Sequence, residues 1–138
     1  MTSTYRTDYK YGREKEAELY ETIKNKFDIN LEPSKERFAL FDYNSKDTSV
    51  ELKSRRVKHD QYPDTMIGIN KVYCANKYPD KTFIFCFNFV DGLYYFKHSN
   101  DYTYNIRFGG HPEAQKTYAF IPVKDLLFIH SSKGGETP

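Results

Sequence analysis

The run Thr82–Phe89 constrains the fold of this chain more than any other segment. Its sequence, TFIFCFNF, is almost continuously apolar, whereas a strand with one face in water alternates apolar and polar residues. We therefore predict a central strand that is buried on both faces, with a layer of structure on each side of the sheet. A helix predicted just before it, between two strands, indicates a crossover that joins a parallel pair.

Patterns elsewhere complete an α/β (α+β) prediction for a single domain at 11–130, with flexible ends at 1–10 and 131–138. Four residues recur at intervals of four and three, which predicts a helix over residues 12–27 with one acid on its apolar stripe: Glu16, Tyr20, Ile23 and Phe27. The other predicted elements are strands at 27–31, 36–43, 48–54, 93–96 and 117–121, a helix at 64–77, a hairpin turn at Asp91-Gly92, a loop at 98–116, a turn or short helix at 123–126 and an extended segment at 127–130.

Composition narrows the class of protein. A chain of 138 residues with 13 Tyr, 11 Phe and no Trp can bury one aromatic core. A net charge of +2 does not by itself indicate a nucleic-acid partner. Cys74 and Cys86 form no CxxC pair, so we expect buried thiols and no zinc site. No apolar run reaches the length of a membrane span and the start is polar, which predicts an intracellular protein, cytoplasmic or nuclear, without a membrane partner.

The residues that carry chemistry lie on two neighbouring predicted strands. Asp42 lies near the end of the predicted strand 36–43, and the triplet Glu51-Leu52-Lys53 lies in the predicted strand 48–54. Side chains alternate along a strand, so Glu51 and Lys53 point to one face while Leu52 points to the other. Two carboxylates and an amine at adjacent strands can hold a hard divalent cation and activate a water beside it. That equipment suits the hydrolysis of a phosphodiester.

This arrangement resembles the PD-(D/E)XK nuclease superfamily, which includes restriction enzymes and junction resolvases. The resemblance covers residues 11 to 89 and implies a restriction-endonuclease-like αβββαβ core, with a mixed central sheet flanked by helices. In this chain a C-terminal hairpin and further strands would extend that core. Phe41 stands where many members have a proline before the first acid.

The resemblance also implies roles for single residues. By position, Asp42 and Glu51 match the family's metal-binding acids, and Lys53 matches its catalytic lysine. Glu16 resembles the acid that many members carry on the first helix, and the backbone carbonyl of Leu52 would be a further metal ligand. The metal would be Mg²⁺, for which Mn²⁺ can substitute. Lys53 would either orient the attacking water or stabilise the charge on the phosphorane.

Each of these residues also has a purely structural interpretation. Asp42 is typical of an acid in a turn at a strand end, and Glu51 and Lys53 are typical of an exposed strand face with a cross-strand ion pair. Glu16 could be a surface acid at the edge of the stripe, like its neighbours Glu14 and Glu18.

A local basic run follows the triplet directly. We predict that Arg55, Arg56 and Lys58 contact phosphates, and that Lys71 on the second helix faces the same groove. Solvated surface charge is the alternative interpretation of this run. Three tyrosines are candidates for stacking on bases, although half-buried packing is the commoner role of such residues: Tyr62, Tyr94 and Tyr95.

Together these features predict Mg²⁺-dependent hydrolysis of DNA by a small endonuclease of phage or viral type. Structure-selective, resolvase-like cutting is one expected form, and a homodimer is a second expectation. The alternative is a catalytically inactive nucleic-acid-binding module that keeps the nuclease fold. The sequence leaves open whether RNA is also a substrate.

Overall fold

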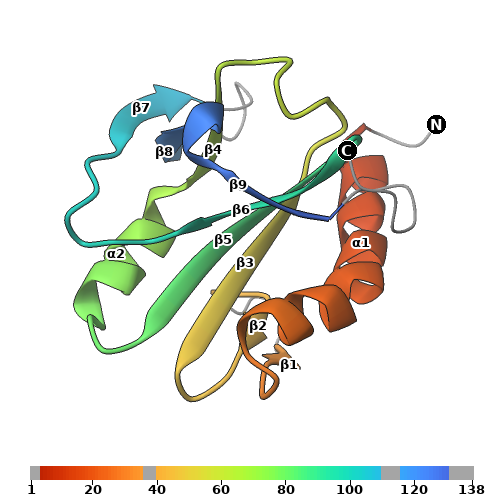
Figure 1. Cartoon of the computed structure of the whole chain (residues 1–138). Coiled ribbons are helices and arrows are strands. Elements are labelled where there is room, and N and C mark those ends of the chain that lie inside the picture. Colours follow the sequence, from red (N-terminus) through yellow and green to blue (C-terminus); the bar gives the residue numbers. More distant parts are fainter. Residues whose placement is uncertain (1–3, 36–39, 110–115, 131–138) are drawn as a thin grey trace.

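The computed structural model describes residues 4–35, 40–109 and 116–130 and contains two helices and two sheets in that part of the chain (Figure 1). The larger sheet has the strand order β1-β2-β3-β5-β6-β9 and the smaller one the order β4-β8-β7. The elements are α1 (Thr4–Phe27), β1 (Glu32–Pro33), β2 (Tyr43–Asn44), β3 (Thr48–Ser54), β4 (Asp64–Gly68), α2 (Ile69–Lys77), β5 (Thr82–Phe89), β6 (Gly92–Lys97), β7 (Asn105–Gly109), β8 (Lys116–Pro122), the 3-10 turn η1 (Val123–Asp125) and β9 (Leu127–His130).

The larger sheet is mixed, as predicted. β3 and β5 are parallel neighbours in register from Thr48↔Thr82 to Ser54↔Asn88, and α2 lies in the connection between them. The β5–β6 pair is an antiparallel hairpin, as predicted, but its two-residue turn is Val90-Asp91, one residue before the predicted Asp91-Gly92, because Gly92 already pairs with Phe89. The order of a helix, three strands, a helix and a strand is therefore present, with one additional strand, β4, before α2.

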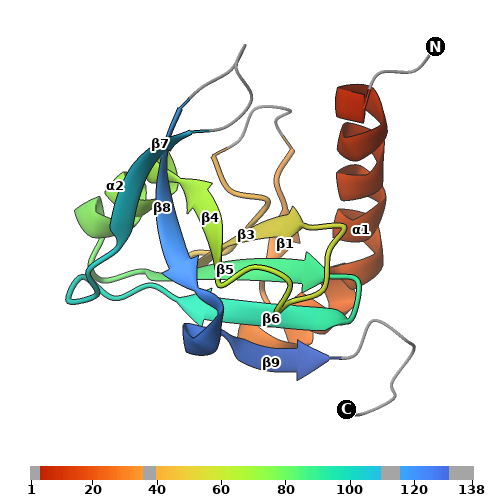
Figure 2. The same ribbon diagram turned by 90° about the horizontal axis from the view of Figure 1, so that it is seen from above.

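Strand β5 is buried on both faces, and its side chains divide the core in two. Its phenylalanines, for example Phe85 and Phe87, pack with α2, β4 and β8. Ile84 and Cys86 point the other way and pack with α1. Figures 1 and 2 show the same division, with α1 on one side of the larger sheet and α2 with the smaller sheet on the other. The apolar run predicted this sandwich because only a strand covered on both faces excludes polar residues from both.

The apolar stripe of α1 faces the sheet. Ile23 is fully buried, while Tyr20 and Phe27 pack against the same core. The helix begins at Thr4, eight residues before the predicted start at Gly12, so residues 4–10, which we expected to be loose, are helical. No helix in the described part of the chain is long and apolar enough to cross a membrane.

Other predicted elements were placed wrongly. The segment 28–31 is a turn, and the first strand is Glu32–Pro33. The second helix begins at Ile69 because Asp64–Gly68 forms β4. β7 lies inside the predicted loop 98–116. Of the predicted strand 36–43, residues 36–39 lie outside the described residues, and the strand that pairs with β3 is only Tyr43–Asn44.

Candidate active site

Asp42 lies at the point where β2 separates from β3. The two strands pair only at Tyr43↔Val50 and Asn44↔Ser49. Just beyond, the Asp42 backbone N–H donates to the Val50 carbonyl at 3.0 Å, and its carboxylate Oδ2 accepts from the Leu52 N–H at 2.7 Å. The Asp42 side chain thus accepts the hydrogen bond that a continuing β2 would accept. This fixes the Asp42 carboxylate beside the middle of β3.

The Leu52 carbonyl faces the same gap. In a strand the N–H and C=O of one residue point to the same edge, as the paired bonds of antiparallel ladders require. Because the Leu52 N–H points to Asp42, its carbonyl oxygen is directed to the side where β2 has left the sheet. This gives the gap a third oxygen of a kind that binds hard cations.

Glu51 is buried between opposite charges. Its side chain is 4% exposed, with Oε2 at 3.1 Å from the Lys53 Nζ and Oε1 at 3.7 Å from the Lys71 Nζ. Burial first, and then the negative charge of Asp42, raise the pKa of Glu51 to about 7, although both lysines act in the opposite direction. The carboxylate is therefore short of positive charge in spite of two neighbouring amines.

Glu16 reaches this group from α1. The hydroxyl of the buried Tyr43 donates to the Glu16 backbone carbonyl, which ties this turn of the helix to β2. Burial, followed by the charge of Asp42, raises the pKa of Glu16 to about 7, while Arg13, 3.5 Å away, opposes the shift. Its neighbours Glu14 and Glu18 are exposed, and Glu18 pairs with Lys15 at 2.9 Å. The position on the stripe thus separates Glu16 from the two surface acids.

Together these residues form what we call the carboxylate cluster: Glu16, Asp42 and Glu51, with the Leu52 carbonyl. Its donors are all oxygens, and the three acids lie close enough that each of the two with a shifted pKa feels the charge of Asp42. A hard divalent cation prefers this donor set and would offset the repulsion. The residues present therefore fit a Mg²⁺ or Mn²⁺ ion.

The two predicted amines both reach this cluster. Lys53 stands at its rim with a side chain that is 40% exposed. Lys71, which we predicted to face the same groove from the second helix, has a side chain that is 13% exposed, donates to the Leu40 carbonyl and lies beside Glu51.

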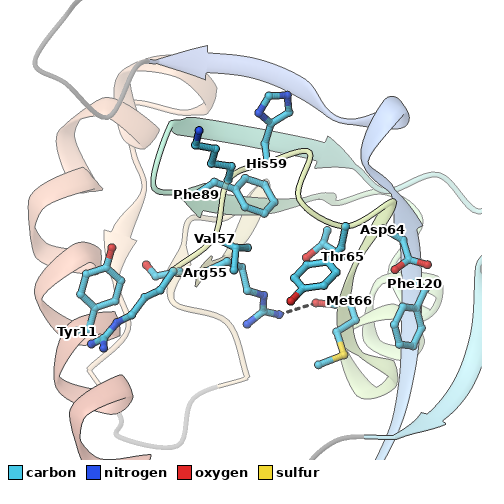
Figure 3. Close-up of a pocket in the computed structure, with 13 residues that line it drawn as sticks. Tyr11, Arg55, Val57, His59, Asp64, Thr65, Met66, Phe89 and Phe120 are labelled. Atoms are coloured by element: carbon cyan, nitrogen blue, oxygen red, sulfur yellow. Dashed lines mark hydrogen bonds between the residues drawn. The ribbon is translucent and has the colours of Figure 1, made fainter. Parts of the chain in front are cut away.

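The basic run lines a separate pocket of ≈ 430 Å³ at the end of β3. The Arg55 guanidinium donates to the Met66 carbonyl at 2.8 Å, as the dashed line in Figure 3 shows. Arg56 is exposed and lies over the ring of Tyr11, 4.3 Å from its centre, and Lys58 is exposed. Within this run, Arg55 is thus held in the pocket wall, while Arg56 and Lys58 stand at the surface.

A second group of possible ligand side chains lies near this pocket, and no motif in the sequence pointed to it. One ligand atom each of His59, Asp60 and Asp91 lies within 4.8 Å of the others. The Asp91 carboxylate accepts from the His59 N–H at 2.9 Å and contacts its ring Nδ1 at 2.6 Å, and that ring stacks on Tyr94. These contacts explain why the three residues lie together: they connect the loop that carries His59 to the turn between β5 and β6.

Comparison with known proteins gives one match. Residues 3–122 match the profile of a family described as "Phage putative PDDEXK endonuclease". This range contains the whole carboxylate cluster and both amines. No curated protein and no solved structure matches the chain.

Proposed function

The chain belongs to the phage PDDEXK endonuclease family, and on this premise we propose that it hydrolyses phosphodiester bonds of DNA with Mg²⁺ as its cofactor. The observation that carries the proposal is the convergence of three acids on one gap, with Lys53 at its rim; the acids come from α1, from the residue before β2 and from β3. Acids on three separate elements meet in this way at a cost, since burial and mutual repulsion disfavour their charged forms. A bound cation is the simplest compensation.

Asp42, Glu51 and the Leu52 carbonyl would hold the ion, with Glu16 as a further acid on the opposite side of the gap. When bound, Mg²⁺ lowers the pKa of water and neutralises charge on the phosphate. The Lys53 Nζ donates a hydrogen bond either to the attacking water or to a phosphoryl oxygen as negative charge grows there. Lys71 holds the opposite oxygen of Glu51 and so keeps that carboxylate in place.

The test is cleavage of labelled supercoiled, linear duplex, single-stranded, flapped and four-way-junction DNA, with an RNA strand included. Each substrate is incubated with Mg²⁺, Mn²⁺ or EDTA, using the wild type, Asp42→Asn and Glu51→Gln. We expect metal-dependent cutting that both substitutions abolish, and the preferred substrate shows whether the enzyme is structure-selective. The dependence of the rate on protein concentration tests the expected homodimer.

Glu18→Gln is the matched control, because Glu18 is an exposed acid on the same helix as Glu16. It should cut like the wild type. If well-folded wild type cuts none of these substrates, the proposal is wrong and a binding module takes its place. Cutting that survives Glu51→Gln would mean that the active site lies elsewhere.

A further inference from the structure

The pocket at the end of β3 contains a cation that has no ion-pair partner among the described residues. Arg55 is partly buried, and its guanidinium makes one hydrogen bond, to the Met66 carbonyl, and no ion pair within the described residues. A guanidinium has five N–H donors and stays protonated in proteins. Buried charges are normally paired, so this one is suited to an anion that enters from outside.

The same pocket presents an aromatic ring with no partner. Tyr62 is 57% exposed, and within the described part of the chain its ring stacks on no other ring and lies under no cation. The other aromatic walls differ in this respect, because Arg56 lies over Tyr11 and Arg107 covers Phe120 at 3.6 Å. A free aromatic face in a wet pocket is the kind of surface on which nucleic-acid bases stack.

Charge and size agree with one kind of occupant. Arg56 and Lys58 add positive charge at the surface, and the acid in the wall, Asp64, is already paired with Arg107 at 2.5 Å. Ser54 also lines the pocket, and its buried Oγ has no hydrogen-bond partner among the described residues. A volume of ≈ 430 Å³ lies within the range of about 300–1,000 Å³ that is usual for small-ligand sites.

The position of the pocket connects it to the carboxylate cluster. Ser54 lines it and is the residue directly after Lys53 on β3. In Figure 3 Tyr11 from α1 and Phe120 from β8 lie on opposite sides, with Arg55 and Val57 between them. The side chains of Lys53 and Ser54 point to opposite faces of β3, but their Cα atoms are about 3.8 Å apart, so a DNA strand with a phosphate at Lys53 would pass close to this pocket.

We propose that the pocket binds one unstacked nucleotide of the substrate strand, with its base on Tyr62 and its phosphate on Arg55. The proposal rests on the proposed function, since it assigns the substrate of that same enzyme. A paired nucleotide must first leave its stack to enter such a pocket. The enzyme therefore prefers DNA that already has an unpaired nucleotide beside the cut, such as a bulge or a flap, over continuous duplex.

The test measures binding in EDTA, where cleavage plays no part, by fluorescence anisotropy. Duplexes of one sequence are compared in three forms: fully paired, with a single unpaired nucleotide, and with an abasic residue at that unpaired position. We expect the wild type to bind the unpaired form roughly tenfold more tightly than either of the other two. Equal affinity for all three forms would overturn the proposal.

Two substitutions separate the two contacts. Tyr62→Ala should remove the difference in affinity between the duplex with an unpaired base and the duplex with an abasic residue. Tyr73 is a tyrosine of similar exposure on α2, and Tyr73→Ala should keep that difference. Arg55→Met should weaken the binding of both unpaired forms. Because Arg55 is in the wall and its variant could fail to fold, Tyr62→Ala is decisive, and base discrimination that survives in Tyr62→Ala contradicts the proposal.

Cleavage of the same duplexes with Mg²⁺ distinguishes this inference from the proposed function. Binding preference without any cleavage would reject the nuclease proposal and leave the nucleotide pocket standing. Metal-dependent cleavage without a preference for the unpaired nucleotide would reject the pocket and leave the nuclease standing.

Discussion

The carboxylate cluster and the pocket lie along one strand and carry opposite charges. The cluster gathers acids from α1, from the residue before β2 and from β3, and two of them have a pKa raised to about 7. The pocket follows at the end of β3 and holds Arg55, whose guanidinium pKa is lowered by burial. One region is thus short of positive charge and the other of negative charge.

This contrast indicates that the charges in neither region are arranged for the stability of the free protein. Burying a charge costs free energy unless its partners compensate it. The chain places a buried carboxylate, Glu51, and a partly buried guanidinium with no ion pair, Arg55, four residues apart. The cluster is suited to a cation, and the pocket to an anion. A metal ion would supply the cation and a nucleic-acid strand the anion, so one complex with metal and substrate would compensate both regions.

The largest expected effect concerns the amine at the rim of the cluster. Lys53→Met removes the hydrogen-bond donor 3.1 Å from Glu51, and we expect the cleavage rate to fall by roughly 10²–10³-fold, as when one donor to a developing negative charge is lost. Single-turnover cleavage under saturating DNA measures this. Lys46→Met, in the exposed turn before β3, is the control. A loss of less than about threefold, well below that range, would remove Lys53 from the chemistry.

Metal binding without DNA gives the next largest effect. If the cluster binds Mg²⁺, a concentration of a hundred times the dissociation constant stabilises the fold by about 2.7 kcal/mol, seen as a higher melting temperature than in EDTA at equal ionic strength. Glu51→Gln should lose most of this increase. An equal increase in the variant would place the ion outside the cluster.

The pH dependence of the metal-free protein tests the repulsion itself. Glu51 ionises near 4.5 when unfolded and near 7 when folded, so between these values the folded state binds more protons. The free energy of unfolding therefore falls as pH rises from about 5 to 8, by on the order of 2 kcal/mol from this residue. Urea unfolding in EDTA at both pH values measures it. Glu51→Gln should reduce the slope, and a wild type that becomes more stable towards pH 8 relative to this variant would contradict the assignment.

The smallest effect is expected at Asp64, the acid in the pocket wall that already has an ion-pair partner. Arg107 and Asp64 form an ion pair at 2.5 Å, but the Arg107 side chain is 48% exposed. We expect Arg107→Ala to cost less than about 1 kcal/mol of stability, as for other surface pairs. Chemical denaturation measures the change. A cost of several kcal/mol would show that the pocket wall depends on this pair, and the contrast with the unpaired Arg55 would then be weaker.

Much of the fold could be predicted because burial imposes a period on the sequence. β3 and β5 were predicted at their observed bounds, since Val50 and Leu52 alternate with polar residues while β5 is apolar throughout. β4 was not, because Met66 and Ile69 also fit a helical stripe and local pattern cannot decide between the two. β7 was missed because its strand residues up to Phe108 are exposed, so that no burial pattern marks them.

The candidate site was predictable to a similar degree. Alternation on β3 and the stripe on α1 indicated which acids lie inward, and the structure brings Glu16, Asp42 and Glu51 together. The sequence did not indicate that Lys71 lies beside Glu51, because that contact depends on how α2 packs, which is a tertiary property. The group around His59 and Asp91 joins residues 32 apart in the chain and has no spacing to reveal it.

The parallel pairing of β3 with β5 also bears on biosynthesis. The three acids and Lys53 all precede residue 54, yet β3 obtains its long neighbour only from Thr82–Phe89. A nascent chain that ends before β5 contains all of these side chains but no sheet to hold them, and such distant pairing forms late in folding. We therefore expect the ribosome-bound chain to stay inert until residue 89 has emerged, which delays any cutting of nearby nucleic acid until synthesis is well advanced.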